Sequence, residues 1–458
     1  MSDSEKLVIT FKGNDLAIIG NTDNLQNQFI HQKNDTLTSF LPRDFFPIID
    51  YLNNNNINYT IKFTHNFKIT PQLEFKKQYS LYDFQQQAVL SWFENNKRGI
   101  LLLPTGSGKT IISLEIISQL QVSTLIVVPT LVLLEQWKNA ICNYLSLNEN
   151  DIGEFGGGKQ DTKMITIITY DSAHLYVKRL RNVFGLLILD EAHHLAGPSY
   201  EIIADGYIAP YRLALTATLD EQESAYENLV SKGFEKIIYS LQPNQLQELE
   251  VLTNYRIETI KVKISGKEEY DHLIGILQGY LKKFQYNPNI SAFKQLIFRV
   301  NKDKEAQEAL QAYNKAKEIS FSAESKLLEL ERLLRQHRED KVLIFSDMVG
   351  FCEKIAKTFF IPCITHRTEK DERLWILNHY KNLPNAKLVV SKILDEGIDI
   401  PDARIGIIMV GSSKSRQFIQ RLGRIVRRYP GKDQAILYEL VSESTLEEKL
   451  ANKRKKGV

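Results

Sequence analysis

Short apolar runs alternate with longer amphipathic stretches in two parts of this 458-residue chain. The first part extends from about Leu81 to Leu241, and its apolar runs are RGILLL, TLIVVP, MITIITY, GLLILD and RLALTAT. The second extends from about Lys341 to Glu443, with the runs KVLIFSD, AKLVVSK, RIGIIMV and AILYELVS. Strands that alternate with helices are typical of a parallel sheet with helices on both faces. The pattern therefore predicts two tandem α/β lobes.

Two further stretches differ from these lobes. Near the amino terminus, KLVITF and DLAIIG alternate like a hairpin, FLPRDFFPIIDYL has helical spacing, and NYTIKF is typical of a strand. This small α+β domain could serve packing or substrate sensing, and the residues favour neither role. Residues 268–335 are charged and helical in pattern, and one predicted helix carries an apolar face made of Leu327, Leu330, Leu333 and Leu334. We expect a small N-terminal domain over 1–75, a first lobe over 76–245, a linker and inserted helical arm over 246–340, and a second lobe over 341–458.

The stretch Leu101–Thr110, LLLPTGSGKT, joins an apolar strand to a helix through a glycine-rich loop. Such a loop turns backbone N–H groups toward one point at a helix N-terminus, where the dipole also attracts phosphate. Lys109 adds a positive charge, and the Thr110 hydroxyl suits a Mg²⁺ ion that bridges the β- and γ-phosphates. Leu103 replaces the first glycine of the general pattern, and a surface turn is the alternative, but the flanking strand and helix favour a nucleotide site. We expect a nucleoside triphosphate to contact Pro104, Thr105, Gly106, Ser107, Gly108, Lys109 and Thr110.

Two carboxylates, Asp190 and Glu191, directly follow the apolar run GLLIL and begin the sequence DEAH. Parallel sheets bind ligands at the carboxyl ends of their strands. Asp190 is therefore placed to hold Mg²⁺, and Glu191 to orient and deprotonate the water that attacks the γ-phosphate. An acidic turn would produce the same pair, but the phosphate loop on a separate strand favours catalysis. His193 is a candidate relay between the nucleotide and the other lobe. The hydroxyls of the triplet Thr216-Ala217-Thr218 suit a hydrogen-bond link between the Asp-Glu segment and the path of a nucleic acid.

The second lobe has no phosphate loop of its own, which indicates a nucleotide held in a cleft between the lobes. Its segment SRQFIQRLGRIVRR is helical in pattern and has Gln420, Arg424 and Arg427 on one face. Two guanidiniums facing the nucleotide would stabilise charge on the transferred phosphoryl group; a basic surface helix is the alternative. The segment LDEGID offers Asp399 as a carboxylate near the ribose, although an ordinary acidic loop explains it equally well.

Composition narrows the setting and the partners. The net charge is only +3, so a nucleic acid would have to be bound by local basic patches. The three cysteines show no metal-binding spacing and indicate a reducing compartment. There is no signal-peptide pattern and no apolar run of about 18 residues, so we expect a cytoplasmic protein without membrane association. No second cluster of His, Asp and Glu suggests a nuclease site, so cleavage would require a partner.

The motifs PTGSGKT, DEAH, TAT, LDEGID and QRLGRIVRR stand in the order found in superfamily 2 helicases, and the chain resembles their DEAH-type members. LYDFQ, which contains Gln85, resembles the adenine-reading motif of these enzymes. VVPTLVLLEQW and ITYDS resemble their nucleic-acid-contacting motifs. The segments AESKLLELERLLRQHREDKVLIFS, FFIPCITHRT and SKILDEGIDIPDA are most similar to the XPB family in its short archaeal form. The resemblance extends from about Leu81 to Glu443.

This resemblance implies RecA-like lobes and a DNA-dependent ATPase that uses Mg²⁺. It also implies 3′-to-5′ translocation or duplex opening in nucleotide excision repair or promoter opening, near the nucleoid or, in a eukaryote, in the nucleus. The N-terminal domain would resemble a damage-recognition domain, the helical insertion would act as a thumb, and a nuclease partner is common among archaeal members. Gln85 would contact ATP. The metal, water and γ-phosphate roles would belong to Asp190, Glu191, Gln420, Arg424 and Arg427, and the DNA backbone would meet Pro129, Thr130, Thr169 and Thr365.

One triplet departs from the family pattern. The family often carries Arg-Glu-Asp shortly after TAT, where this chain has Glu221-Gln222-Glu223. The acidic triplet mildly favours a translocase that moves on duplex DNA without strong unwinding. An RNA helicase of DEAH type would share the ATP chemistry. An ATP-gated scaffold for a nuclease is a third alternative, against which the intact pairs Asp190-Glu191 and Arg424/Arg427 argue.

Overall fold

The computed structural model divides the chain into two compact units. One comprises Met1–Gln245 with Glu396–Ile398, and the other Leu246–Asp395 with Asp399–Val458. The structure describes residues 7–20, 32–34, 37–68, 73–76, 79–197, 199–217, 219, 224–249, 253–283, 292–391, 403–411, 425 and 434–454. In the described parts, none of the helices combines the length and the apolar character that crossing a bilayer requires.

The first unit begins with a five-stranded sheet of order β3-β4-β2-β1-β5. Its strands are β1 (Leu7–Lys12), β2 (Asp15–Ile19), β3 (Gln32–Asn34), β4 (Leu37–Phe40) and β5 (Tyr59–Ile61). The hairpin predicted from alternation is β1 and β2, which pair antiparallel, and the predicted helix is α1 (Phe45–Asn54). Buried side chains of Ile9, Leu16, Phe40 and Phe45 give this layer a core of its own.

An eight-stranded sheet of order β13-β6-β12-β11-β7-β10-β8-β9 forms the rest of the first unit. Its neighbouring strands pair parallel, except for β8 and β9 at one edge. All five runs predicted as strands are strands of this sheet. The bounds are β6 (Arg98–Leu102), β7 (Thr124–Val128), β8 (Ile152–Gly156), β9 (Lys159–Gln160), β10 (Ile165–Thr169), β11 (Leu186–Asp190), β12 (Tyr211–Thr216) and β13 (Ile237–Ser240).

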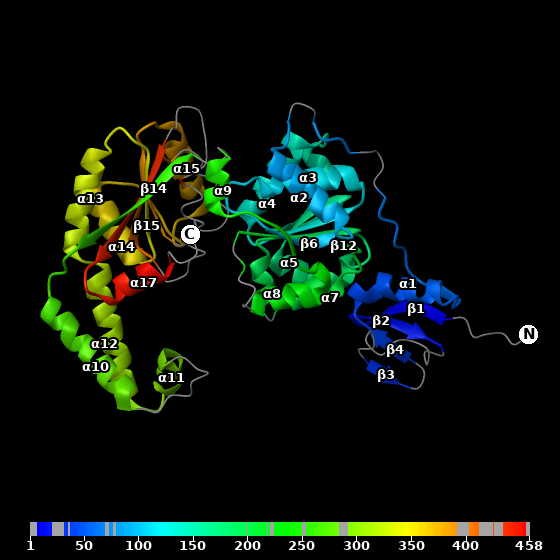
Figure 1. Cartoon of the computed structure of the whole chain (residues 1–458), viewed down its shortest axis with the longest axis horizontal. Helices are drawn as coiled ribbons and strands as arrows, with labels where there is room; N and C mark the ends of the chain where they lie inside the picture. The colour runs from blue at the N-terminus through cyan, green and yellow to red at the C-terminus, as the bar shows by residue number, and fades with distance from the viewer. Residues whose placement is uncertain are drawn as a thin grey trace, which may run out of the picture. The chain divides into compact units, whose positions relative to one another are not determined.

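Helices cover both faces of this sheet (Figure 1), as an all-apolar parallel strand requires. One face carries α2 (Asp83–Glu94), α3 (Lys109–Leu120) and α4 (Leu131–Tyr144). The other carries α5 (Tyr170–Leu175), α6 (Val177–Leu180), α7 (Glu201–Gly206) and α8 (Ser224–Leu229), while α9 (Pro243–Glu248) follows β13. The strand β11 is buried along its whole length, and its one polar residue, Asp190, stands at its carboxyl end.

The second unit contains a six-stranded parallel sheet of order β14-β19-β18-β15-β17-β16. Its strands are β14 (Asn254–Val262), β15 (Val342–Ser346), β16 (Cys363–Ile364), β17 (Lys387–Val390), β18 (Ile405–Val410) and β19 (Gln434–Ser442). All four predicted strands are present, and β14, from the range expected to be a linker, forms the edge beside β19. The associated helices are α13 (Glu324–Gln336), α14 (Val349–Phe359), α15 (Lys370–Asn382) and α17 (Leu446–Arg454).

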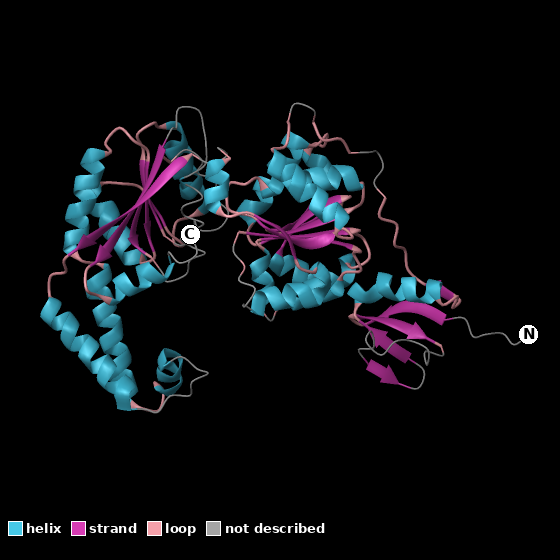
Figure 2. Ribbon diagram, viewed as in Figure 1, coloured by secondary structure: helices cyan, strands magenta, loops and turns pink. Residues whose placement is uncertain are grey.

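The predicted helical arm consists of α10 (Lys267–Lys283), α11 (Ala292–Arg299) and α12 (Lys304–Phe321). Figures 1 and 2 show α10 and α12 side by side, with α11 next to them. Alanines of α12 permit the close approach, because Ala306, Ala309, Ala312 and Ala316 are buried against α10 and α11. The leucine face predicted for α13 packs on the six-stranded sheet, where Leu330 and Leu333 are fully buried.

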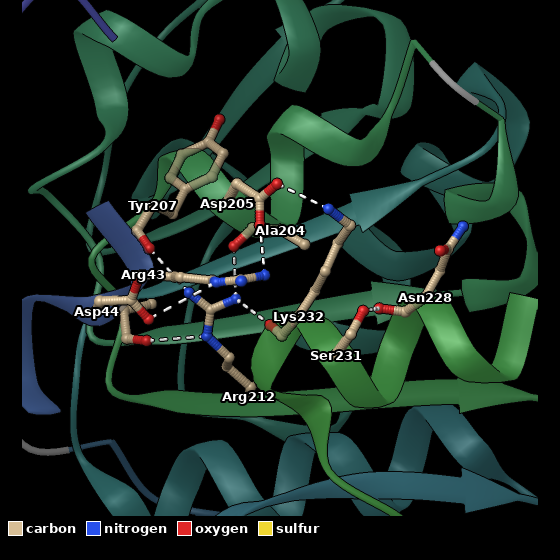
Figure 3. Close-up of polar contacts among 10 residues, drawn as sticks. Arg43, Asp44, Ala204, Asp205, Tyr207, Arg212, Asn228, Ser231 and Lys232 are labelled. Carbon is tan, nitrogen blue, oxygen red and sulfur yellow. Dashed lines mark hydrogen bonds and ion pairs between the residues drawn. The ribbon is translucent and has the colours of Figure 1, made fainter. Parts of the chain in front are cut away.

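The small N-terminal sheet is attached to the eight-stranded sheet within the first unit by polar contacts. Arg43 Nη1 lies 2.6 Å from Asp205 Oδ1, as Figure 3 shows. The guanidinium of Arg181 donates a 2.9 Å hydrogen bond to the Gly13 carbonyl and stacks 3.5 Å from the centre of the Phe11 ring. These contacts join residues far apart in the sequence into one body.

Arg212, the second residue of β12, lies beneath this junction and is 1% exposed. Its guanidinium donates to four carbonyl oxygens, at 2.7 Å, 2.8 Å, 3.2 Å and 3.3 Å, which belong to Ala204, Tyr207, Lys232 and Ala209 respectively. Burial lowers its pKa to about 9, so the side chain is still a cation at neutral pH. Arg212 therefore links the end of α7 and the segment that follows it to the helical turn that contains Lys232 (Figure 3).

We predict that Arg212→Leu lowers the free energy of unfolding by about 2–5 kcal/mol, because four buried carbonyl groups lose their donor. Urea unfolding followed by circular dichroism measures the change. Arg335→Met is the matched control, since that side chain is 80% exposed and pairs only with Glu331 one helical turn away. The control should change stability by less than about 0.5 kcal/mol. Equal effects of the two substitutions would contradict the structural role of Arg212.

Candidate functional site

Five neighbouring parallel strands bring the candidate residues to the edge of the eight-stranded sheet that is formed by the carboxyl ends of these strands. The strands occur in the order β6, β12, β11, β7, β10. Their register aligns Leu102 with Thr216, Leu215 with Asp190, and Val128 with Thr169. Across this edge the structure therefore places, in the same order, the phosphate loop, Thr216, Asp190, Thr130 and Thr169.

The phosphate loop connects β6 to α3. Gly106 and Gly108 have φ values of +87° and +82°, which only glycine adopts without strain, and Gly108 is the N-cap of α3. Lys109 Nζ lies 3.1 Å from the Leu103 carbonyl oxygen and 3.5 Å from that of Pro104. The ammonium thus folds back over its own loop, where a phosphate oxygen would be a stronger acceptor than these neutral carbonyls.

Gln85, the third residue of α2, contacts the phosphate loop directly. Its Nε2 donates a 2.8 Å hydrogen bond to the Ser107 carbonyl, and its Oε1 accepts from the Tyr82 backbone N–H at 3.0 Å. The side chain is 3% exposed, and a Cβ at position 108 would collide with its amide. Gln85 therefore links the start of α2 to the loop, whereas its contact with adenine stays a prediction.

Asp190 and Glu191 lie at the end of β11 and in the turn that follows. Burial raises the pKa of the Asp190 carboxyl, while a hydrogen bond from Trp137 and the charge of Lys109 oppose that rise. Glu191 adopts φ +48°, a left-handed conformation that costs a non-glycine residue free energy and is concentrated at functional sites. The Nδ1 atom of His193 is 3.4 Å from Glu191 Oε2 and 3.2 Å from Thr216 Oγ1. His193 therefore contacts both Glu191 and Thr216, whereas a link from the acidic pair to the nucleic-acid path stays a prediction.

The residues at this edge fit a bound Mg²⁺–nucleotide. Thr110 and Asp190 supply hydroxyl and carboxylate oxygens, the hard donors that Mg²⁺ prefers, and this ion usually takes few protein ligands beside phosphates and water. Each Asp190 oxygen already accepts one hydrogen bond, from the Glu191 N–H at 3.0 Å and from Trp137 at 2.8 Å. Each retains a lone pair for a metal or a metal-bound water.

Two of the candidate DNA contacts cap helices in the first unit. Thr130, which follows Pro129, is the N-cap of α4, and its Oγ1 accepts from the Leu133 N–H at 3.2 Å. Thr169 caps α5 and accepts from the Ser172 N–H at 3.3 Å. In the second unit, Thr365 follows β16 and its Oγ1 accepts from the Arg367 N–H at 3.1 Å. Hydroxyls and backbone N–H groups of this kind are common phosphate contacts in DNA complexes.

Several predicted site residues lie outside the described residues, and their roles stay predictions. They are Asp399, Gln420, Arg424, Arg427, Thr218 and the acidic triplet Glu221-Gln222-Glu223.

Two buried aromatic residues at the site were missed by the sequence analysis. Trp137 donates its indole N–H to Asp190 Oδ2, and Tyr170 donates its hydroxyl to the Asp190 backbone carbonyl at 3.0 Å. Both occur in the motifs already singled out, at the end of VVPTLVLLEQW and within ITYDS. An aromatic residue with a polar hydrogen in an apolar segment was the available signal, because such groups usually find a partner when buried.

Comparison with known proteins agrees with this geometry. Residues 78–221 match the family model for the Type III restriction enzyme res subunit, and residues 301–458 match that for the ERCC3/RAD25/XPB C-terminal helicase. The DNA 3′-5′ translocase XPB2 of Sulfurisphaera tokodaii is 39% identical over 387 residues, which cover 83% of this chain and 85% of that protein. The chain belongs to the XPB family. The expectation of an XPB-type DNA helicase or translocase with DNA-dependent ATPase activity is thereby confirmed.

More distant relatives share less of their length with the chain. The DNA 3′-5′ helicase XPB of Kineococcus radiotolerans is 27% identical and matches 82% of this chain, but only 62% of its own length is covered. The general transcription and DNA repair factor IIH helicase/translocase subunit XPB of Dictyostelium discoideum is 27% identical. The match covers 85% of this chain and 47% of that protein. The Pyrococcus furiosus Hef helicase domain has a TM-score of 0.51 at 17% identity, covers 81% of this chain and 98% of that chain, and supports the fold class alone.

The family assignment corrects one classification. The chain carries the letters Asp-Glu-Ala-His at 190–193, but XPB enzymes are not DEAH-type helicases, so the expected DEAH-type membership is wrong. The wider assignment to superfamily 2 is confirmed.

We predict that Lys109→Ala weakens nucleotide binding about 10- to 100-fold, because a charge-assisted hydrogen bond to phosphate is lost. Titration with a fluorescent ATP analogue measures the dissociation constant. Lys163→Ala is the control, since this exposed lysine precedes β10 and therefore lies at the opposite edge of the sheet. Unchanged affinity in Lys109→Ala would place the nucleotide elsewhere.

Glu191→Gln should preserve nucleotide binding and lower the turnover number by roughly 100- to 10,000-fold, the usual contribution of a general base. Phosphate release under saturating ATP measures turnover. Glu201→Gln is a suitable comparison, because this carboxylate pairs with Lys232, whose carbonyl oxygen accepts from Arg212 near the amino end of β12. Turnover close to that of the wild type would exclude Glu191 as the base.

Proposed function

We propose that this protein uses ATP hydrolysis at the phosphate loop to move along DNA in the 3′-to-5′ direction. The observation that carries the proposal is the order of groups along one sheet edge. The phosphate loop and the acidic pair lie on β6 and β11, and the candidate DNA contacts Thr130 and Thr169 follow the adjacent strands β7 and β10. A conformational change at the nucleotide site could therefore reach the candidate DNA contacts through neighbouring strands of one sheet.

Mg²⁺ and ATP together would supply an activated phosphoanhydride and charge neutralisation at its γ-phosphate. Lys109 and the loop N–H groups would bind the phosphates, with Thr110 and Asp190 holding the metal. Glu191 would accept the proton of the attacking water, and the His193–Thr216 contact would transmit the change in charge at Glu191 to β12. Gln420, Arg424 and Arg427 would add hydrogen bonds and positive charge to the γ-phosphate side, and Asp399 would contact the ribose.

The DNA contacts proposed here are directed at the backbone. Pro129, Thr130, Thr169 and Thr365 would meet phosphate and sugar, so binding should show little sequence preference and a steep dependence on salt. Support for a role in repair or promoter opening comes from the family resemblance and from the names of relatives such as the Dictyostelium protein, a general transcription and DNA repair factor subunit. The same resemblance supports a nuclease as a protein partner and a location near the nucleoid, or in the nucleus of a eukaryote.

A duplex translocase that unwinds weakly is the second candidate. The relative from Sulfurisphaera tokodaii is named a translocase, and this chain carries the acidic triplet Glu221-Gln222-Glu223 where the family often has Arg-Glu-Asp. Without a basic side chain at that position, the protein would bind a DNA phosphate backbone there less tightly.

Steady-state ATP hydrolysis with no nucleic acid, single-stranded DNA, duplex DNA and matched RNA tests the proposal. We expect DNA to stimulate hydrolysis at least about tenfold, and stimulation to fall as salt rises because phosphate contacts release counterions. Lys109→Ala controls for contaminating ATPases. A preference for duplex DNA without strand separation would favour the translocase, whereas equal stimulation by RNA or no stimulation would contradict the proposal.

A further inference from the structure

Trp137 occupies an unusual place for a core tryptophan. Its side chain is 1% exposed, and its indole N–H donates a 2.8 Å hydrogen bond to the carboxylate of Asp190, which is itself 6% exposed. A hydrogen bond from a neutral donor to a buried carboxylate is stronger than one between neutral groups, and losing it leaves a buried charge less well solvated. The orientation of the Asp190 carboxylate is therefore tied to the position of Trp137.

The helix that carries Trp137 begins at a candidate DNA contact. Thr130 is the N-cap of α4, and Trp137 follows seven residues later, about two helical turns or 10 Å along the axis. Backbone hydrogen bonds from each residue to the fourth residue before it join successive turns of α4, so the start of the helix and Trp137 are mechanically linked. A phosphate that draws the start of α4 toward itself would consequently displace the indole N–H at the Asp190 carboxylate.

A second contact reaches Asp190 from the start of α5, which follows β10, the strand on the far side of β7. Tyr170 directly follows Thr169, is buried, and donates its hydroxyl to the Asp190 backbone carbonyl at 3.0 Å. Thus Thr130 and Thr169 each belong to a segment that holds a different part of Asp190, one the side chain and the other the backbone.

Trp92 in the same unit shows what an ordinary buried tryptophan looks like. It is fully buried in α2, and its indole N–H donates a 3.0 Å hydrogen bond to the Arg212 carbonyl, near the amino end of β12. The two tryptophans are similarly buried and each indole N–H donates a hydrogen bond, but of the two only Trp137 donates to a carboxylate of the acidic pair.

We propose that Trp137, assisted by Tyr170, is a positioning residue that couples DNA binding at the start of α4 to the orientation of the Asp190 carboxylate. The inference rests on the proposed function, because it takes the Thr130 end of α4 to be a DNA contact. By reciprocity, nucleotide bound at Asp190 must alter DNA affinity by the same factor by which DNA alters nucleotide affinity.

The test measures this coupling factor by equilibrium binding, without turnover. Fluorescence anisotropy with labelled single-stranded DNA gives the dissociation constant in the absence and in the presence of Mg²⁺ and a non-hydrolysable ATP analogue. We expect the two constants of the wild type to differ by roughly 5- to 150-fold. Trp137→Phe keeps an aromatic ring but removes the donor, and it should bring the factor to within about twofold of one. Its DNA affinity without nucleotide should stay within about twofold of the wild type.

Trp92→Phe is the matched control and should retain the coupling factor of the wild type. Tyr170→Phe removes a single oxygen atom and should lower the factor in the same direction as Trp137→Phe, so it tests the proposal even if Trp137→Phe fails to fold. Urea unfolding of each variant identifies such a failure. Coupling factors of Trp137→Phe and Tyr170→Phe equal to that of the wild type would overturn this inference, as would an equal loss in Trp92→Phe.

The wild type separates this inference from the function on which it rests. A wild-type protein that does not bind DNA at all would refute the proposed function and this inference with it. A wild-type protein that binds DNA and shows coupling, beside variants that couple equally well, would refute only the role of Trp137 and Tyr170.

Discussion

The alignment of parallel strands is the constraint on which the candidate site depends. Parallel pairing brings the carboxyl ends of β6, β12, β11, β7 and β10 together at one end of the sheet, and the middle of each strand is apolar and buried. Residues that are more than one hundred positions apart in the sequence, such as Lys109 and Thr216, become neighbours in the row because of strand order alone. A shift of one residue in any of these strands would turn its terminal side chain to the other face.

The opposite edge of the same sheet, where the parallel strands begin, carries structural polar groups. Arg212 lies near the amino end of β12, where its guanidinium donates to carbonyl groups of α7, of the segment after α7 and of the turn at Lys232. Thr216 lies at the carboxyl end of the same strand. The Arg43–Asp205 ion pair joins the N-terminal sheet to this edge. The two ends of β12 therefore have different roles. Arg212, near the amino end, lies beside the attachment of the N-terminal sheet, and Thr216, at the carboxyl end, lies beside the acidic pair.

The elements that could be predicted from sequence were those with a strong local pattern. Continuous apolar runs identified β6, β7, β10, β11 and β12, because a strand buried on both faces needs no other signal. The strand β14 was missed since NYRIETIKV mixes charged and apolar residues at an edge, and β8 was missed since IGEFG contains two glycines. The motifs located Lys109, Asp190 and Glu191, but the contacts of Asp190 with Trp137 and Tyr170 depend on which strands are neighbours. No local pattern encodes that order, nor the pairing of Arg43 with Asp205, 162 residues away.

The left-handed backbone of Glu191 has a consequence for how this protein can evolve. A glycine at that position would adopt the same turn at lower conformational cost, and an engineered search for thermostability would favour it. In the proposed reaction the Glu191 carboxylate is the general base, so at the turn after β11 glycine would favour stability and glutamate would favour the reaction. A substitution at position 191 that raises the melting temperature while it lowers turnover would therefore mark a residue whose backbone strain serves the proposed reaction.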